Sequence, residues 1–160
     1  MKNQKVLYVT QAAIVAALYV VFTFFAYLLG IDKMVVQVRF SEALCVLPFF
    51  IPSAVPGLFI GCLISNLIFG AQIWDIIFGS IATLIGAYIA GKIKNKWLVP
   101  LPTVISNTVI VPLVLVYAYR IEQAYPIAVL GVFAGEVISC YILGMLLLLS
   151  LEKYPRIFKK

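Results

Sequence analysis

The chain has 160 residues, of which 64% are hydrophobic and 11% charged, and its mean hydropathy is +1.13. This composition leaves too little polar surface to cover a water-soluble globule, so we expect an integral membrane protein. The formal net charge is +6, but the basic residues lie at the chain ends and in one connecting segment, which argues against a nucleic-acid-binding surface. The length allows roughly five to seven membrane crossings, so we expect residues 1–160 to form one transmembrane domain.

The sequence offers few groups for metal, redox or hydrolytic chemistry. Cys45, Cys62 and Cys140 lie inside apolar segments and match no CxxC pair, so we expect them to pack in the core. The chain contains no His, which argues against a zinc or haem site and removes the usual general base. It also contains no GxxxxGK[ST] phosphate loop and no GxSxG motif. We therefore expect neither an enzyme nor a cofactor.

The first predicted element is an uncharged transmembrane helix over residues 6–30, a run that continues too far for a secretory signal. Ala12 and Ala16, and likewise Ala13 and Ala17, are four residues apart. Each pair places small side chains on one helix face, where another helix can approach closely. The spacing is compatible with packing inside the bundle and with docking of a separate subunit.

A mixed segment, Val35–Pro48, lies between two apolar blocks and contains Arg39 and Glu42. Apolar and polar residues alternate in its first half, a pattern that is typical of an extended segment. We expect this segment to lie over the bundle. Ser41 can cap a short second helix over residues 41–51, in which Glu42 suits the positive end of the helix dipole. The two charges belong either to a structural ion pair or to a site for a polar ligand.

Prolines and glycines divide the remaining apolar sequence into further helices. Proline removes a backbone donor and clashes with the preceding turn, so Pro48, Pro52 and Pro56 separate the second helix from the third. The predicted third to sixth helices cover residues 54–69, 75–91, 100–119 and 126–151. The fourth carries small residues for close helix contact, namely Gly79, Ser80, Thr83 and Gly86.

Six transmembrane helices place both chain ends on one side of the membrane, together with the basic segment Gly91–Lys96. Nine of the twelve basic residues then collect on that side, which identifies it as cytoplasmic. We therefore predict an all-α integral membrane protein with cytoplasmic N- and C-termini. The nine residues are Lys2, Lys5, Lys92, Lys94, Lys96, Lys153, Arg156, Lys159 and Lys160.

The polar residues of the predicted helices converge on the outer half of the bundle. Asn107 and Glu136 lie roughly 16–18 Å below the outer helix ends, a depth at which an ionisable side chain is costly unless it is paired or hydrated. We expect an acidic, amide-lined and aromatic cavity, which suits a small polar or cationic ring compound. Helix bridging by the asparagines and helix capping by Asp75 are the alternative roles. The candidate binding residues are Arg39, Glu42, Asn66, Trp74, Asp75, Asn107, Glu136 and Ser139.

Four segments, TQAAIVAAL, VRFSEALCVLPFF, PSAVPGLFIGCLISNLIFG and WDIIFGSIATLIGA, together resemble the QueT family, the substrate-binding S-components of energy-coupling factor (ECF) transporters. The resemblance covers nearly the whole chain, and residues 38–86 are its most specific part. It implies an S-component bundle in the bacterial plasma membrane that associates with a membrane-coupling subunit and two ATPase subunits. It also implies that the coupling subunit contacts Ala12, Ala13, Ala16 and Ala17.

The resemblance further implies that the ligand is a queuosine precursor, a deazaguanine base with an aminomethyl group or its cyclopentenyl derivative. Our hypothesis is that Glu136 or Glu42 accepts the guanine edge in bidentate fashion, while Asp75 or the other glutamate faces the amine. Asn66 and Asn107 would then hold the remaining ring polar atoms. A small self-assembling channel or exporter, and an S-component for another vitamin, are the alternatives.

Overall fold

The computed structural model describes residues 2–31, 36–118 and 125–154, and all regular secondary structure in these ranges is helical. Several consecutive elements join into longer helices, so that six helical segments result, as predicted. The elements are α1 (Lys2–Leu29), η2 (Phe40–Phe49), α2 (Ala54–Ile68), η3 (Asp75–Gly79), α3 (Ser80–Ala90), η4 (Lys96–Leu98), α4 (Leu101–Leu113), η5 (Val114–Ala118), α5 (Tyr125–Glu136), η6 (Val137–Leu143) and α6 (Gly144–Glu152).

The six helical segments differ in length. Three are long and apolar enough to cross a membrane: Asn3–Leu29, Lys96–Tyr117 and Tyr125–Glu152. The apolar segments Ala54–Ile68 and Asp75–Ala90 are shorter. Six crossings of the bilayer therefore remain a prediction, whereas the six helical segments are confirmed.

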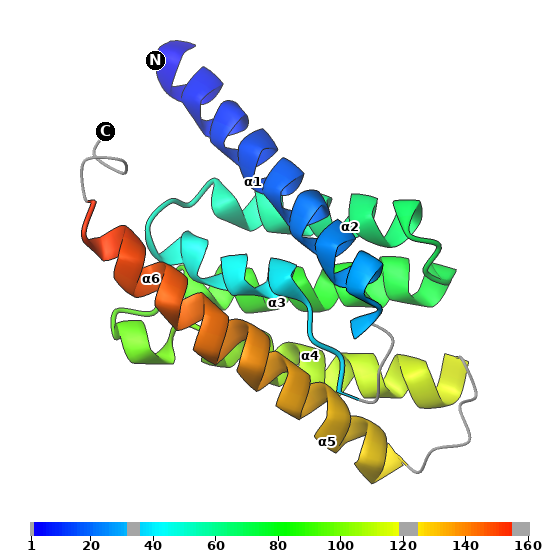
Figure 1. Cartoon of the computed structure of the whole chain (residues 1–160). Helices are drawn as coiled ribbons and strands as arrows, with labels where there is room; N and C mark the ends of the chain where they lie inside the picture. Colours follow the sequence, from blue (N-terminus) through cyan, green and yellow to red (C-terminus); the bar gives the residue numbers. More distant parts are fainter. Residues whose placement is uncertain (1, 32–35, 119–124, 155–160) are drawn as a thin grey trace.

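The short second helix, η2, is a 3₁₀ helix rather than an α-helix. Pro48 lies inside it, where its ring cannot donate a backbone hydrogen bond. Every residue from Ser41 to Pro48 is buried, and η2 packs against α1, α3, η6 and α6. Figure 1 shows this element, in cyan, crossing the middle of the molecule. The charged stretch therefore leads directly into the core.

Helices α1 and α2 are in close contact at two glycines. A Cβ added to Gly57 would lie 2.7 Å from the Ala12 carbonyl oxygen. One added to Gly61 would lie 2.6 Å from the Tyr19 Cβ. Both distances are too short for real carbon atoms, so only glycine permits this approach. The contact fixes the position of Tyr19 in the bundle.

The two alanine pairs of α1 face different surroundings. Ala16 is buried and Ala12 half-buried on the side of α2, so this pair packs within the bundle. Ala13 and Ala17 are exposed. Packing and exposure are thus divided between the two pairs, and Ala13 and Ala17 form the exposed pair.

The beginning of α1, the end of α6 and the segment between α3 and α4 lie toward the same end of the molecule (Figure 1). Lys96 Nζ forms an ion pair with Glu152 Oε2 at 2.8 Å, which joins η4 to the end of α6. Ser53 Oγ donates to Gln11 Oε1 at 2.8 Å, which joins the start of α2 to α1. This is the end that the basic residues predict to be cytoplasmic. Three of those residues, Arg156, Lys159 and Lys160, lie outside the described residues.

The three cysteines are free and buried, as predicted. Cys62 belongs to an apolar cluster built around α1, η2 and α2. Cys45 and Cys140 belong to a second cluster between η2, α4, η6 and α6. Between these two clusters, η2 brings its glutamate inward.

Candidate functional site

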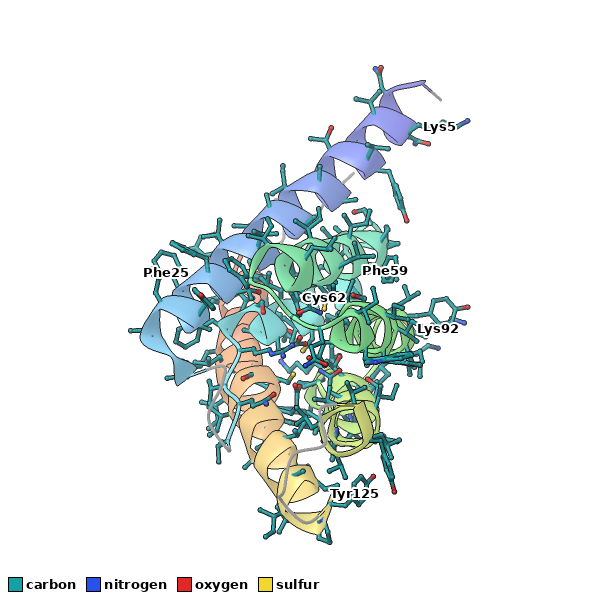
Figure 2. All side chains as sticks on the ribbon, turned by 90° about the vertical axis from the view of Figure 1, so that its right-hand side faces the viewer. Lys5, Phe25, Phe59, Cys62, Lys92 and Tyr125 are labelled. Atoms are coloured by element: carbon teal, nitrogen blue, oxygen red, sulfur yellow. The ribbon has the colours of Figure 1, made fainter. Side chains whose placement is uncertain are left out.

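Two carboxylates meet inside the bundle. Glu42 of η2 is 2% exposed and Glu136 at the end of α5 is 6% exposed. One oxygen of each carboxylate and the Cys140 sulfur lie within 4.8 Å of one another. Figure 2 shows nitrogen, oxygen and sulfur atoms gathered between the helices in the middle of the molecule. We call Glu42, Glu136 and the polar groups that contact them the buried polar cluster.

Both oxygens of Glu136 accept hydrogen bonds. Asn107 Nδ2, from α4, donates to Oε1 at 3.0 Å, and Cys140 Sγ, from η6, lies 3.3 Å from Oε2. Asn107 is itself only 4% exposed. A buried carboxylate needs such donors to offset the hydration that it loses. The deep glutamate and asparagine predicted from the sequence are therefore direct partners.

Glu42 is held by Tyr19, which was not among the residues predicted from the sequence. The hydroxyl of Tyr19, in α1, donates to Glu42 Oε1 at 2.5 Å, and Tyr19 is 2% exposed. A tyrosine in the middle of an apolar helix usually finds a partner for its hydroxyl when it is buried. The position of Tyr19 in an apolar helix was therefore the sequence signal that its hydroxyl has a buried partner. Cys140 also contacts η2, with its sulfur 3.6 Å from the Glu42 carbonyl oxygen.

Arg39 lies at the edge of the cluster, directly before η2. Its backbone N–H donates to Ser139 Oγ at 3.1 Å, and Ser139 is buried. Its guanidinium interacts electrostatically with Glu42 and with Asp75. The cluster therefore combines two acidic groups with one fixed cation.

The segment 36–39 crosses α5 next to Glu136. A Cβ added to Gly135 would overlap the Gln37 carbonyl group, so the backbone of this segment rests directly on the helix. Arg39 has an extended conformation, with φ −117° and ψ 111°. Val38 N–H donates to the Ile31 carbonyl at 3.3 Å. The backbone angles of Arg39 and the contact of Gln37 with Gly135 agree with the predicted extended segment over the bundle.

Asn66 and Asp75 form a second polar group beside the cluster. Asn66 Nδ2 donates to the Asp75 backbone carbonyl at 3.1 Å and lies 3.6 Å from the Cys62 sulfur. Thr83 Oγ1 is 3.5 Å from the same sulfur. The Asn66 side chain thus joins the end of α2 to η3, which is the bridging role that the sequence left open.

Trp74 is not buried with these residues. It is 47% exposed, and its ring stacks on Phe78 with centroids 6.0 Å apart. Of the eight candidates, the structure brings five into the buried polar cluster and places two beside it. The five are Arg39, Glu42, Asn107, Glu136 and Ser139, and the two are Asn66 and Asp75.

Comparisons with known proteins assign the chain to a family. The family model described as QueT transporter matches residues 9–153. The queuosine precursor transporter QueT of Lactococcus lactis subsp. cremoris (strain MG1363) is 40% identical over 86 residues, which are 53% of this chain and 50% of that protein. No solved structure matches the chain. Because the family match extends over most of its length, this multi-pass membrane protein belongs to the QueT transporter family.

Proposed function

We propose that this chain is the substrate-binding S-component of an ECF-type importer and that it takes up a queuosine precursor. Membership of the QueT transporter family supports the proposal, as does the printed name of the Lactococcus relative. The observation that carries it is the buried polar cluster, in which two carboxylates from different elements meet. Such a site suits a small ligand with several hydrogen-bond donors.

The chemistry of a deazaguanine base matches this cluster. A guanine-like edge presents two adjacent N–H donors, which one carboxylate accepts in bidentate fashion. The aminomethyl substituent is a cation and needs the second carboxylate. A cationic group on the ligand would pair with the charge of an ionised Glu42 or Glu136, since an unpaired charge is costly in a buried site.

Ligand binding requires the present hydrogen bonds to be exchanged. Tyr19 OH donates to Glu42, and Asn107 and Cys140 donate to Glu136, so these groups occupy the oxygens that a ligand would use. We propose that ligand N–H groups replace some of these donors and that the segment 36–39 moves to admit the ligand. Asn107 then turns its amide to a ring heteroatom.

The partners follow from the same assignment. We propose that a membrane-coupling subunit docks on the exposed side of α1 at Ala13 and Ala17, where small side chains allow a second helix to approach. Energy would come from two ATPase subunits bound to that coupling subunit. The proposed topology has six crossings, with both termini and Gly91–Lys96 in the cytoplasm.

Calorimetry on the purified chain tests the substrate. The panel contains deazaguanines with and without the aminomethyl group, guanine and common vitamins. We expect saturable binding of the aminomethyl compound and at least tenfold weaker binding of the compound without the amine, because the second carboxylate then loses its partner. If no deazaguanine binds, the substrate assignment is wrong.

Purification and reconstitution test the role. An S-component co-purifies with two ATPases and supports ATP-dependent uptake in vesicles that contain all subunits. A self-assembling channel would instead conduct ions when the chain is reconstituted alone. That result would replace the proposed function.

A further inference from the structure

An apolar groove runs along the outer face of the molecule between α3 and α4. It encloses about 440 Å³, and none of the eight candidate binding residues lines it. Its only polar side chain, Ser106, donates to the Ala82 carbonyl at 2.9 Å and the Thr103 carbonyl at 3.1 Å. The groove therefore offers hydrocarbon contact and no open hydrogen-bonding group along its length.

Close packing of the two helices forms the floor of this groove. A Cβ added to Gly86 would lie 2.7 Å from the Thr103 Cα, so α3 and α4 nearly touch there. Bulky side chains stand on both sides of the contact and are about half exposed: Ile89 by 45% and Ile105 by 54%. The result is a narrow slot with two aliphatic walls.

The groove extends over only part of the bilayer. Its lining runs from Ile85 to Ile93 on one wall and from Leu98 to Ile110 on the other, and the longer wall spans roughly 18 Å at 1.5 Å per residue. One leaflet contributes about half of a ~30 Å hydrocarbon core. The slot therefore matches one leaflet, at the end of the molecule that carries the segment between α3 and α4.

Two lysines are the sequence neighbours of a residue at that end of the groove, although neither lines it. Lys92 and Lys94 are both exposed. They flank Ile93, which is the last residue that lines the groove on the side of α3. Neither is paired with a carboxylate in the part of the chain that the structure describes, whereas Lys96 is paired with Glu152. Lys92 Nζ donates to the Tyr88 hydroxyl at 2.6 Å and lies 4.0 Å above its ring.

An exposed aromatic side chain marks the same level. Trp97 is 56% exposed, and Lys96 Nζ lies 5.9 Å from its ring centroid. Tryptophan, tyrosine and lysine together are typical of the headgroup level of a membrane. The hydrocarbon slot thus ends where headgroups are expected and where two cations are available.

We propose that this groove is a binding site for one anionic phospholipid. An acyl chain lies in the slot between α3 and α4, and the phosphate lies between Lys92 and Lys94. A zwitterionic lipid could also place an acyl chain in the slot, but it carries no net charge that would attract the lysines. A helix of another protein would fill the slot without needing these cations, so the charge favours lipid. The inference does not depend on the proposed substrate.

Native mass spectrometry of the full-length chain, released from nanodiscs, tests the site. The nanodiscs contain equal amounts of phosphatidylglycerol and phosphatidylcholine with the same acyl chains. We expect one phosphatidylglycerol molecule to be retained at least five times more often than phosphatidylcholine. The double change Lys92→Gln and Lys94→Gln should abolish this preference. Ile89→Trp should reduce retention of both lipids.

Matched variants separate the site from general effects. Lys153→Gln removes an exposed lysine elsewhere, and Ile60→Trp enlarges an aliphatic side chain that is 44% exposed on α2. Both should retain lipid like the parent chain. If Ile89→Trp fails to fold, Ile105→Trp fills the slot from the other wall.

Four outcomes would overturn the proposal. The two lipids could be retained equally, or the groove variants could behave like their controls. Glycerol phosphate without acyl chains could displace the bound phosphatidylglycerol, which would indicate a site for free phosphate. Finally, Ile89→Trp could leave lipid retention unchanged and reduce recovery of a partner subunit, which would indicate a protein interface.

Discussion

The hydrogen bonds of the two buried glutamates come from three different parts of the chain. Tyr19 belongs to α1, Asn107 to α4 and Cys140 to η6, and each donates to a carboxylate oxygen. The geometry of the acidic pair is therefore set by helices that are far apart in the sequence. A relative shift of α1 or α4 would change which oxygens are free to accept from a ligand.

Glu136→Gln tests the role of the deep carboxylate. The variant keeps an acceptor for Asn107 but loses the negative charge. Hydrogen bonds to charged groups are worth about 1.5–3 kcal/mol, so we expect ligand affinity to fall by about 10- to 100-fold in calorimetry. Glu152→Gln is the matched control, because Glu152 is exposed and, within the described part of the chain, its ion pair is with Lys96. Equal affinities for the two variants would remove Glu136 from the binding site.

Among the elements, the segment 36–39 connects the exterior of the bundle to its acidic centre. It rests on Gly135 through the Gln37 backbone and is joined to η6 by the bond from Arg39 to Ser139. Both contacts lie within four residues of Glu136. A movement of this segment would therefore uncover the carboxylate without unfolding a helix.

Gly135→Ala should displace this segment. The added methyl group overlaps the Gln37 carbonyl, and overpacking of this kind costs about 1–3 kcal/mol. We expect faster hydrogen exchange at the backbone amides of Val38 and Arg39, with exchange in α1 and α2 unchanged. Gly91→Ala is the control, since its Cβ would lie 3.4 Å from the nearest neighbours. Protection at Val38 and Arg39 equal to that of the control would contradict the packing described here.

For the whole molecule, α1 contributes to both of the proposed interfaces. One side packs on Gly57 and Gly61 and carries Tyr19 to the buried glutamate. The other side exposes Ala13 and Ala17. The same rigid helix thus contacts the site and is available to a partner, which would let docking alter the site through a small movement of α1.

Replacing Ala13 and Ala17 with leucine tests the docking face. Both side chains are exposed, so the isolated subunit should keep its thermal midpoint and its ligand affinity. We expect recovery of the coupling subunit and ATPases in co-purification to fall at least tenfold, because leucine prevents close helix approach. Leu7→Phe with Leu18→Phe enlarges two exposed positions of α1 that lie outside the i, i+4 row of Ala13 and Ala17 and should leave assembly intact. Normal assembly of the Ala13/Ala17 variant would place the interface elsewhere.

Much of this arrangement follows from local sequence signals. Prolines and glycines set the helix boundaries, and the similar depths of Asn107 and Glu136 along their helices predict that both lie in the same half of the bundle. The close contact at Gly86 was also predictable from small-residue spacing. These features depend on one helix or on two helices in simple register, which is why composition and spacing reveal them.

Other features depend on how several helices rotate about their axes. Whether Trp74 faced inward could not be decided from its proximity to Asp75 in the sequence. For Asn66 the sequence left ligand binding and helix bridging open, and its amide joins α2 to η3. The two alanine pairs differ by one residue in register, and only the packing of Gly57 and Gly61 determines which pair is buried.

In the proposed topology, the unequal helix lengths imply that the surrounding bilayer is not uniform in thickness. The α2 helix has 15 residues and extends roughly 22 Å, whereas the 28 residues of α1 extend roughly 42 Å. A hydrocarbon core of about 30 Å is thicker than the length of α2 and thinner than the length of an upright α1. If α2 crosses the membrane as predicted, lipids beside it would have to thin while α1 tilts, each at a modest cost for every ångström of mismatch. The resulting elastic strain in the membrane makes the tilt of the protein sensitive to bilayer thickness.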